Sequence, residues 1–163
     1  HNHDHGAKKV ARHTVRFGID SFVYERRRPF HEQRLAVACG GLPLVTCRIP
    51  DSPLRRVLRS KGFCWLSNHG DNAMYWSHAG KHFEIRAAGP WWASLSNDMQ
   101  PSGQMPAKVA ADFEGEYGDR RQEIVIIGIS MDKEAICSLL DSCLVTDEEM
   151  EEYKKKYDDT ATN

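Results

Sequence analysis

No apolar run in this 163-residue sequence approaches the roughly 18 residues that a membrane-spanning helix needs. A basic excess is missing too, since 22 basic and 23 acidic residues leave a formal net charge of -1. Proteins that bind a phosphate backbone usually carry clustered positive charge, which argues against a nucleic-acid partner. The sequence therefore predicts one globular domain of ordinary size, with neither a membrane nor a nucleic-acid partner.

Phosphate-binding and catalytic motifs are also missing. A nucleotide-binding phosphate loop has the pattern G-x-x-x-x-G-K-[ST], and none of the glycines begins such a string. The dinucleotide motif G-x-G-x-x-G, the zinc motif H-E-x-x-H and the nucleophile motif G-x-S-x-G are not found either. We therefore expect the chain alone to be neither an enzyme nor a nucleotide-binding protein.

The sequence has few cysteines, and their spacing forms no recognisable pair. The five residues form no C-x-x-C motif, and their odd number favours a reducing compartment: the cytoplasm, or an organelle if a targeting peptide precedes this chain. Most of them lie in apolar stretches, where a free cysteine usually acts as a small hydrophobic residue. The chain starts at His1 rather than Met and shows no signal peptide, so we expect a fragment of a longer protein.

Residues 1–13 are polar and predict a histidine-rich linker or tail. His1, His3 and His5 alternate with Asn2 and Asp4, and neutral imidazole suits Zn²⁺, Co²⁺ or Ni²⁺. These histidines are the candidate metal ligands of the chain. A remnant of an expression tag and a solvated tail are the alternatives, and the sequence leaves them open.

The first half of the body alternates strand and helix signals. Val15, Phe17, Ile19 and Val23 share one parity, which predicts a half-buried strand over 15–24 with these residues inward. Pro29 suits the first turn of a helix that ends near Gly40. An irregular proline-rich stretch over 42–53 and a short helix over 54–59 follow. Three short segments, at 62–67, 73–78 and 82–87, then predict an antiparallel meander.

The second half predicts one strand and two helices. The run Ile124–Ile127 is β-branched throughout, which predicts a central strand over 123–129 that is buried on both faces. Asp132 can cap a helix with an apolar stripe, and Thr146 with Glu149 forms a capping box for the last helix. The expected fold is α+β: a single domain over 14–150 with a mainly antiparallel sheet and helices on one face, followed by a charged helix end and tail over 151–163.

Four ordered motifs resemble those of one known family. Arg27-Arg28-Pro29-Phe30-His31 follows the first strand, and Leu58-Arg59-Ser60-Lys61-Gly62-Phe63-Cys64-Trp65-Leu66 begins the meander. Gly89-Pro90-Trp91-Trp92 and Gly118-Asp119-Arg120-Arg121-Gln122-Glu123 come later. Together they are similar to the C-terminal domain of the CobW family of metal-handling GTPases, over about residues 16–149.

The resemblance implies an accessory or regulatory domain that docks on a GTPase domain in cis, in a protein that delivers zinc or cobalt to client metalloproteins. A stand-alone metal- or protein-binding module is the alternative. Guanidinium groups favour bidentate pairing with carboxylates, so the predicted docking residues come from two turns. They are Arg26, Arg27, Arg28 and His31 at one turn and Arg120 and Arg121 at the other. An ion pair between Asp119 and Arg120 within the chain is the competing interpretation.

Overall fold

The computed structural model describes residues 18–40, 51–95 and 105–161. The histidine-rich start, most of the proline-rich stretch and part of the loop after residue 95 lie outside these ranges. Five strands form one sheet in the order β1-β5-β2-β3-β4, with every neighbouring pair antiparallel. The strands are β1 (Ile19–Arg26), β2 (Val57–Cys64), β3 (Asn72–Ala79), β4 (His82–Pro90) and β5 (Gln122–Ile129).

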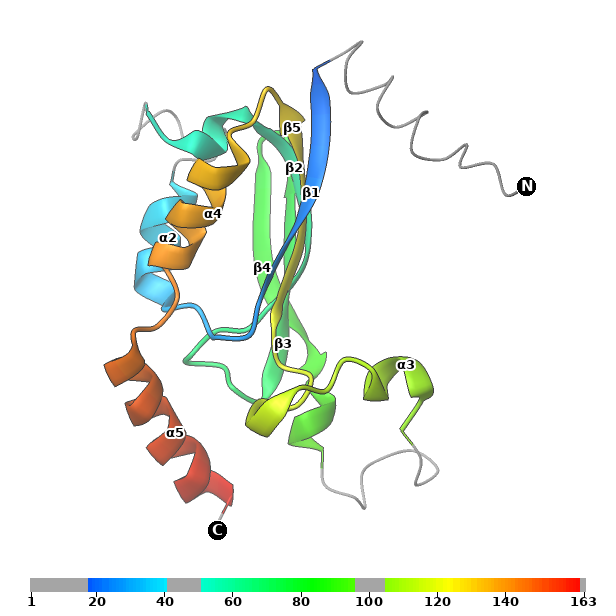
Figure 1. Cartoon of the computed structure of the whole chain (residues 1–163), viewed down its shortest axis with the longest axis vertical. Helices are drawn as coiled ribbons and strands as arrows, with labels where there is room; N and C mark the ends of the chain where they lie inside the picture. Colours follow the sequence, from blue (N-terminus) through cyan, green and yellow to red (C-terminus); the bar gives the residue numbers. More distant parts are fainter. Residues whose placement is uncertain (1–17, 41–50, 96–104, 162–163) are drawn as a thin grey trace, which may run out of the picture.

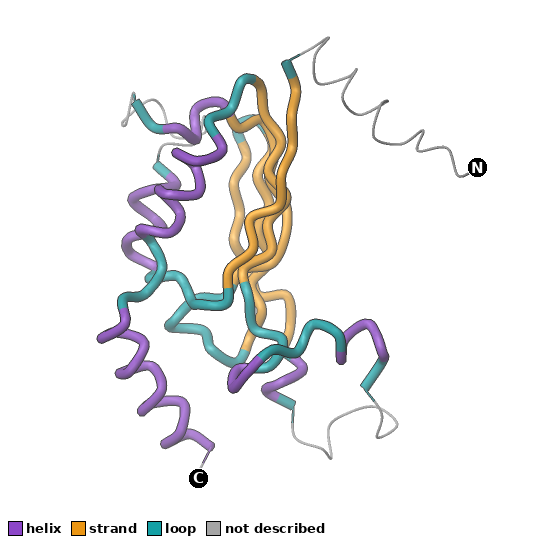
Figure 2. Tube along the Cα trace, in the orientation of Figure 1, coloured by secondary structure: helices purple, strands orange, loops and turns teal. Residues whose placement is uncertain are grey.

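Two helices, α2 (Glu32–Cys39) and α4 (Lys133–Ser142), cover one face of the sheet, as Figures 1 and 2 show. The core lies between these helices and the sheet, and includes Tyr24, Phe30 and Ile136. The last helix, α5 (Asp147–Ala161), extends past the end of the sheet. The predicted α+β fold, with one antiparallel sheet and helices on one face, is confirmed.

The remaining elements are short. They are a 3₁₀ turn η1 (Pro53–Arg56), a 3₁₀ turn η2 (Trp92–Ser94), the helix α3 (Ala107–Ala110) and a 3₁₀ turn η5 (Gly115–Tyr117). No helix within the described ranges is long and apolar enough to cross a membrane. A second, smaller hydrophobic cluster joins α5 to the meander; its buried members are Trp65, Ala73, Trp91 and Tyr153.

Local signals predicted where α4 and α5 begin. Asp132 caps α4 by accepting a hydrogen bond from the amide of Ala135 at 3.0 Å, and the predicted stripe is inward because Ile136 and Leu140 are buried. The capping box of α5 is confirmed as well. That helix continues past residue 150, in line with the charged helix end that the sequence predicted there.

Strand orientation was predicted less well. Ile19 and Val23 were expected to face inward, yet they are 41% and 49% exposed, while Tyr24 is fully buried. The strand over 123–129 was expected to be buried on both faces, yet β5 alternates, and Val125 is 40% exposed. Both predictions were wrong for one reason: helices cover only one face of this sheet, so apolar residues remain on the other.

Two helix predictions also change. Pro29 does not start α2, which begins at Glu32 after His31 has capped it; the chain around Pro29 instead pairs with the segment after α4. The helix expected over 54–59 is a single 3₁₀ turn, and β2 already begins at Val57.

Candidate docking surfaces

The three arginines of the first turn bond mainly to the chain itself. Arg26 forms a two-pronged contact with Asp141 of α4, at 2.9 and 3.2 Å. Arg27 donates to the carbonyl oxygens of Asp112 and Gly118, and Arg28 donates to the carbonyl of Val145 and to Asp147. These contacts fix the end of β1 against α4, α5 and the segment before β5. The arginine turn is therefore a structural junction whose side chains stay about one-third exposed.

The side chains of the second predicted turn are more buried and form more of their hydrogen bonds within the chain. The carboxylate of Asp119 accepts hydrogen bonds from the amides of Trp92 and Ala93, at 3.0 and 2.9 Å. The predicted pair between Asp119 and Arg120 is therefore replaced by a carboxylate cap on η2. Gln122, which is fully buried, donates to the carbonyls of Arg28 and Trp65 and accepts from the Trp65 amide.

Arg120 is buried, at 1% exposure, beside the second hydrophobic cluster. It donates to the carbonyl oxygens of Gly70 and Tyr117 and stacks over the ring of Tyr157, with its Cζ 4.9 Å from the ring centroid. A buried guanidinium cannot contact a partner in this structure, so a structural role replaces the predicted docking role. Arg121 is mostly covered and pairs with Asp112 and Glu123.

The fold brings the two turns together, which the sequence could not show. Arg27 bonds to the Gly118 carbonyl at 3.2 Å, and Gln122 bonds to the Arg28 carbonyl at 2.9 Å. A groove of about 660 Å³ lies beside the first turn and is lined by it together with Asp141 and residues 144–147. The use of Arg26, Arg27 and Arg28 in docking stays a prediction, and any partner must compete with their present contacts.

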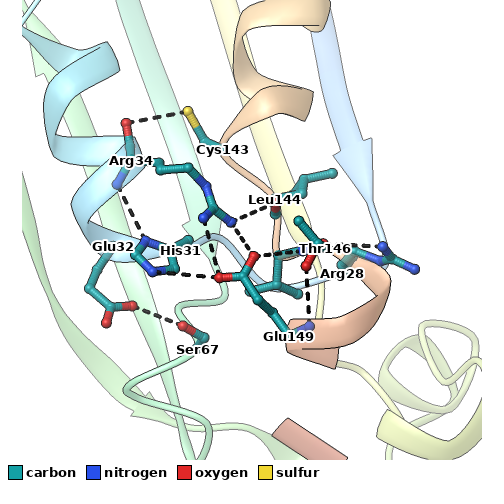
Figure 3. A network of polar contacts seen from close by, with 10 residues as sticks. Arg28, His31, Glu32, Arg34, Ser67, Cys143, Leu144, Thr146 and Glu149 are labelled. Carbon is teal, nitrogen blue, oxygen red and sulfur yellow. Dashed lines mark hydrogen bonds and ion pairs between the residues drawn. The ribbon is translucent and has the colours of Figure 1, made fainter. Parts of the chain in front are cut away.

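His31 belongs to a polar network that seats α5, shown in Figure 3. Its Nδ1 accepts a hydrogen bond from the Arg34 amide at 3.4 Å, and its Nε2 lies 3.7 Å from Glu149. Glu149 accepts two hydrogen bonds from the Arg34 guanidinium, at 2.6 and 3.2 Å, and one from the Thr146 amide. His31 thus caps α2 and lines the contact between α2 and α5; its use in docking also stays a prediction.

The Arg34 guanidinium, followed by the Thr146 amide, lowers the pKa of Glu149 from its ordinary 4.5 to about 2. Because the folded-state pKa is depressed, the stabilisation is present above pH 4.5 and is lost as the pH falls towards 2. We expect α5 to loosen in that window and tryptophan fluorescence to change, since Trp65, one of four tryptophans, donates a hydrogen bond to Tyr153 of α5 at 3.1 Å. The measurement is an acid titration of fluorescence.

Glu149→Gln serves as the control, because an amide keeps the shape but does not titrate. Other carboxylates also protonate in acid, so the difference between the two proteins is the informative quantity. Identical acid titrations for both would show that Glu149 does not hold α5.

A metal centre does not form in the described part of the chain, where no three His, Cys, Asp or Glu side chains are grouped to hold an ion. Cys39 and Cys64 are buried, and burial raises the pKa of each thiol to about 12. Such thiols stay protonated at neutral pH and act as small hydrophobic residues, as predicted. His1, His3 and His5 lie outside the described residues, so their prediction as metal ligands is untested.

The second face of the sheet carries a surface that the sequence did not predict. No described helix lies over it, and α3 sits beyond the end of the sheet (Figure 1). Direct cross-strand pairs place apolar residues side by side, Ile19 opposite Ile129 and Val23 opposite Val125. We call this surface the open face; it comprises Ile19, Val23, Phe63, Val125, Ile127 and Ile129, with Arg59 and Lys61 of β2 among them.

The fold defines a small α+β domain with one antiparallel sheet and helices on one face. The family model described as the cobalamin synthesis protein cobW C-terminal domain matches residues 19–144. The chain therefore belongs to the CobW C-terminal domain family, as the four motifs suggested.

Individual relatives agree with this assignment. Zinc-regulated GTPase metalloprotein activator 1 of Dictyostelium discoideum is 35% identical over 138 residues, which cover 84% of this chain and 27% of that protein. A zinc chaperone of Mycobacterium tuberculosis is 30% identical over 129 residues, which cover 78% of this chain and 30% of that protein. The chain thus spans less than a third of the length of these relatives.

Solved structures share the fold. The Zn(II)-bound YjiA GTPase from E. coli superposes with a TM-score of 0.51 at 17% sequence identity, covering 89% of this chain and 34% of that chain. A triple mutant of the same GTPase gives the same TM-score over 78% of this chain. At this identity the likeness concerns the arrangement of the sheet and helices alone.

Several residues that organise these surfaces escaped the sequence interpretation. Arg34 carries no local signal beyond its polarity, because its partner Glu149 lies 115 residues away. Gln122 stood in one of the four motifs, but its role was not predicted because its partner Arg28 lies 94 residues away. The open face did carry a signal, since apolar residues occur at both parities of the run Ile124–Ile127. We interpreted that run as burial on both faces, whereas it reflects a covered face and an uncovered apolar face.

Proposed function

We propose that this chain is the accessory, regulatory domain of a GTP-dependent metal-handling protein, and that it docks on a GTPase domain in cis. The observation that carries the proposal is the family match over 19–144. The matched part makes up less than a third of two relatives, whose names describe a zinc-regulated GTPase metalloprotein activator and a zinc chaperone. A client metalloprotein is the second proposed partner. Catalysis belongs to the other domain.

Regulation requires that the domain contact the GTP and GDP states of its neighbour with different free energies, because equal contact shifts neither state. The experiment uses the protein encoded by the full reading frame, with and without residues 18–163. We expect GTP turnover or metal transfer to change several-fold when this domain is removed. A reading frame without a phosphate loop, or unchanged turnover and transfer, would refute the accessory role.

We propose further that Zn²⁺, or Co²⁺ or Ni²⁺, binds the histidine-rich start of the chain. Zinc is the metal named in both relatives, and imidazoles are suitable ligands for it. Removing residues 1–5 is expected to abolish most zinc uptake, measured as bound metal per chain after dialysis. Replacing Asn2 alone, which leaves the three imidazoles in place, is the control. Unchanged zinc content after the truncation would contradict a metal site at His1, His3 and His5.

A further inference from the structure

Apolar residues on the open face are contiguous rather than scattered. Seven large hydrophobic residues in the described ranges are exposed, and five of them, Ile19, Val23, Phe63, Val125 and Ile129, lie on this face at 39–49% exposure. Single exposed apolar residues are ordinary on a protein surface, whereas a contiguous patch marks a contact site. The pairs across β1 and β5 build this patch directly.

A hollow of about 430 Å³ lies within the open face. Val125, Ile127 and Ala79 contribute apolar atoms to its lining, and Arg59 and Lys61 contribute the positive charge. Arg59 pairs across the strands with Ile127, and Lys61 with Val125, so each cation stands beside an apolar residue. Neither cation forms an ion pair within the described ranges. In contrast, the arginines of the two turns are engaged with the chain's own acceptors.

The geometry points to the open face as the surface on which the GTPase domain in cis docks. This inference rests on the proposed function and names the surface that performs it. The partner surface must present an apolar side chain that enters the hollow, flanked by carboxylates that meet Arg59 and Lys61. An anchor in a pocket, surrounded by polar contacts, is how most interfaces concentrate their binding energy.

The composition of the open face fits an interdomain contact better than a stable dimer. Charged residues share the face with the apolar ones. Glu25 of β1 lies opposite Glu123 of β5 in the strand register, and Arg86 stacks over Tyr75. Contacts between domains of one chain are more polar than obligate interfaces, which are strongly apolar.

Connectivity also favours a domain in cis. The segment that precedes β1 enters the sheet at Gly18, next to Ile19, the first residue of the patch. A tethered domain has an effective concentration in the millimolar range, so a modest patch is occupied in cis before a free partner competes.

Hydroxyl-radical footprinting of the full-length protein tests the location. Phe63 lies on the open face, and Met150 on α5 lies away from it and serves as the internal reference. We expect Phe63 to be oxidised several-fold more slowly in the full-length protein than in this chain alone, with Met150 unchanged. Protection of Met150 without Phe63 would place docking elsewhere and overturn the inference.

Variants test the energetics. Val23→Thr combined with Val125→Thr keeps β-branched side chains of nearly the same volume, so the strands are preserved while apolar contact is lost. We expect this pair, and separately Lys61→Glu, to restore Phe63 oxidation and to change GTP turnover several-fold. Val37→Thr is the matched control, because Val37 is 70% exposed on α2, on the covered side of the sheet.

The outcomes separate this inference from the proposed function. If removal of the domain changes turnover but the open-face variants do not, only the docking surface is wrong. If removal has no effect, the accessory function itself fails. If Phe63 is protected from oxidation in this chain alone, and the chain has twice its monomer mass in solution, the open face binds a second copy. Protection that requires an added client would assign it to that client, and either result overturns the inference.

Discussion

Replacing Arg120 with alanine is expected to lower the free energy of unfolding by about 3–4 kcal/mol. The variant leaves buried carbonyl groups without a hydrogen-bond donor and creates a cavity. Among the residues that the structure describes, Arg120 is the one Lys or Arg whose large side chain is fully buried. Its Nε donates to the Gly70 carbonyl at 2.7 Å, its Nη1 donates to the Tyr117 carbonyl at 3.1 Å, and its Nη2 bonds to Ser94. Alanine can donate to none of these acceptors.

The measurement is chemical denaturation of the isolated chain, followed by the fluorescence of its four tryptophans, Trp65 among them. Arg59→Ala is the matched control, since Arg59 is exposed and unpaired in the described ranges; its cost should stay within about 0.5 kcal/mol. A variant at Arg120 as stable as the wild type would show that the guanidinium is not held inside, and would reopen its predicted role in docking.

Replacing Gly62 with alanine is expected to cost about 3 kcal/mol or more, because the added methyl group overpacks a site bounded by backbone. A Cβ at Gly62 would overlap the carbonyl oxygen of Glu123 and lie 2.8 Å from the Cα of Ile124. Both atoms belong to β5, which pairs with β2 at this point. Backbone atoms within a sheet cannot move aside as a flexible side chain can, so the pairing of the two strands must open.

Gly80→Ala provides the comparison for this substitution. Gly80 has a positive φ of 57° but no atom within 4 Å of an added Cβ, so its cost should be about 1–2 kcal/mol from conformation alone. Urea titration of both variants measures the difference. Equal stability losses would mean that the close approach of β2 and β5 at Gly62 adds no cost for an extra Cβ.

Both predictions concern residues inside the motifs that carry the family resemblance. Gly62 is the glycine of the first meander motif, and Arg120 is the first of the two arginines in the turn before β5. The structure gives each a reason that the motif alone does not state: close approach of two backbones for Gly62, and an internal set of acceptors for Arg120. Motif residues in this domain therefore serve the fold at least as much as the surface.

The sequence by itself determined the elements whose signals are local. The cap at Asp132 and the capping box of Thr146 with Glu149 depend on contacts within a few residues. The antiparallel meander follows from turn signals between strands that are neighbours in the sequence. Helix caps and turns obey such short-range rules, so they were predicted from spacing alone. The α+β class followed, because alternating apolar strands and one-sided helices must pack in layers.

Only the tertiary structure decided which side of each strand is covered and which polar side chains form hydrogen bonds in the interior. Parity shows that Val23 and Tyr24 point to opposite faces, but not on which face α2 and α4 lie. The fate of Arg120 depends on Gly70, fifty residues away along the chain. Burial and hydrogen bonding between distant segments depend on the summed packing of the whole chain, and a local pattern contains no information about its distant partner.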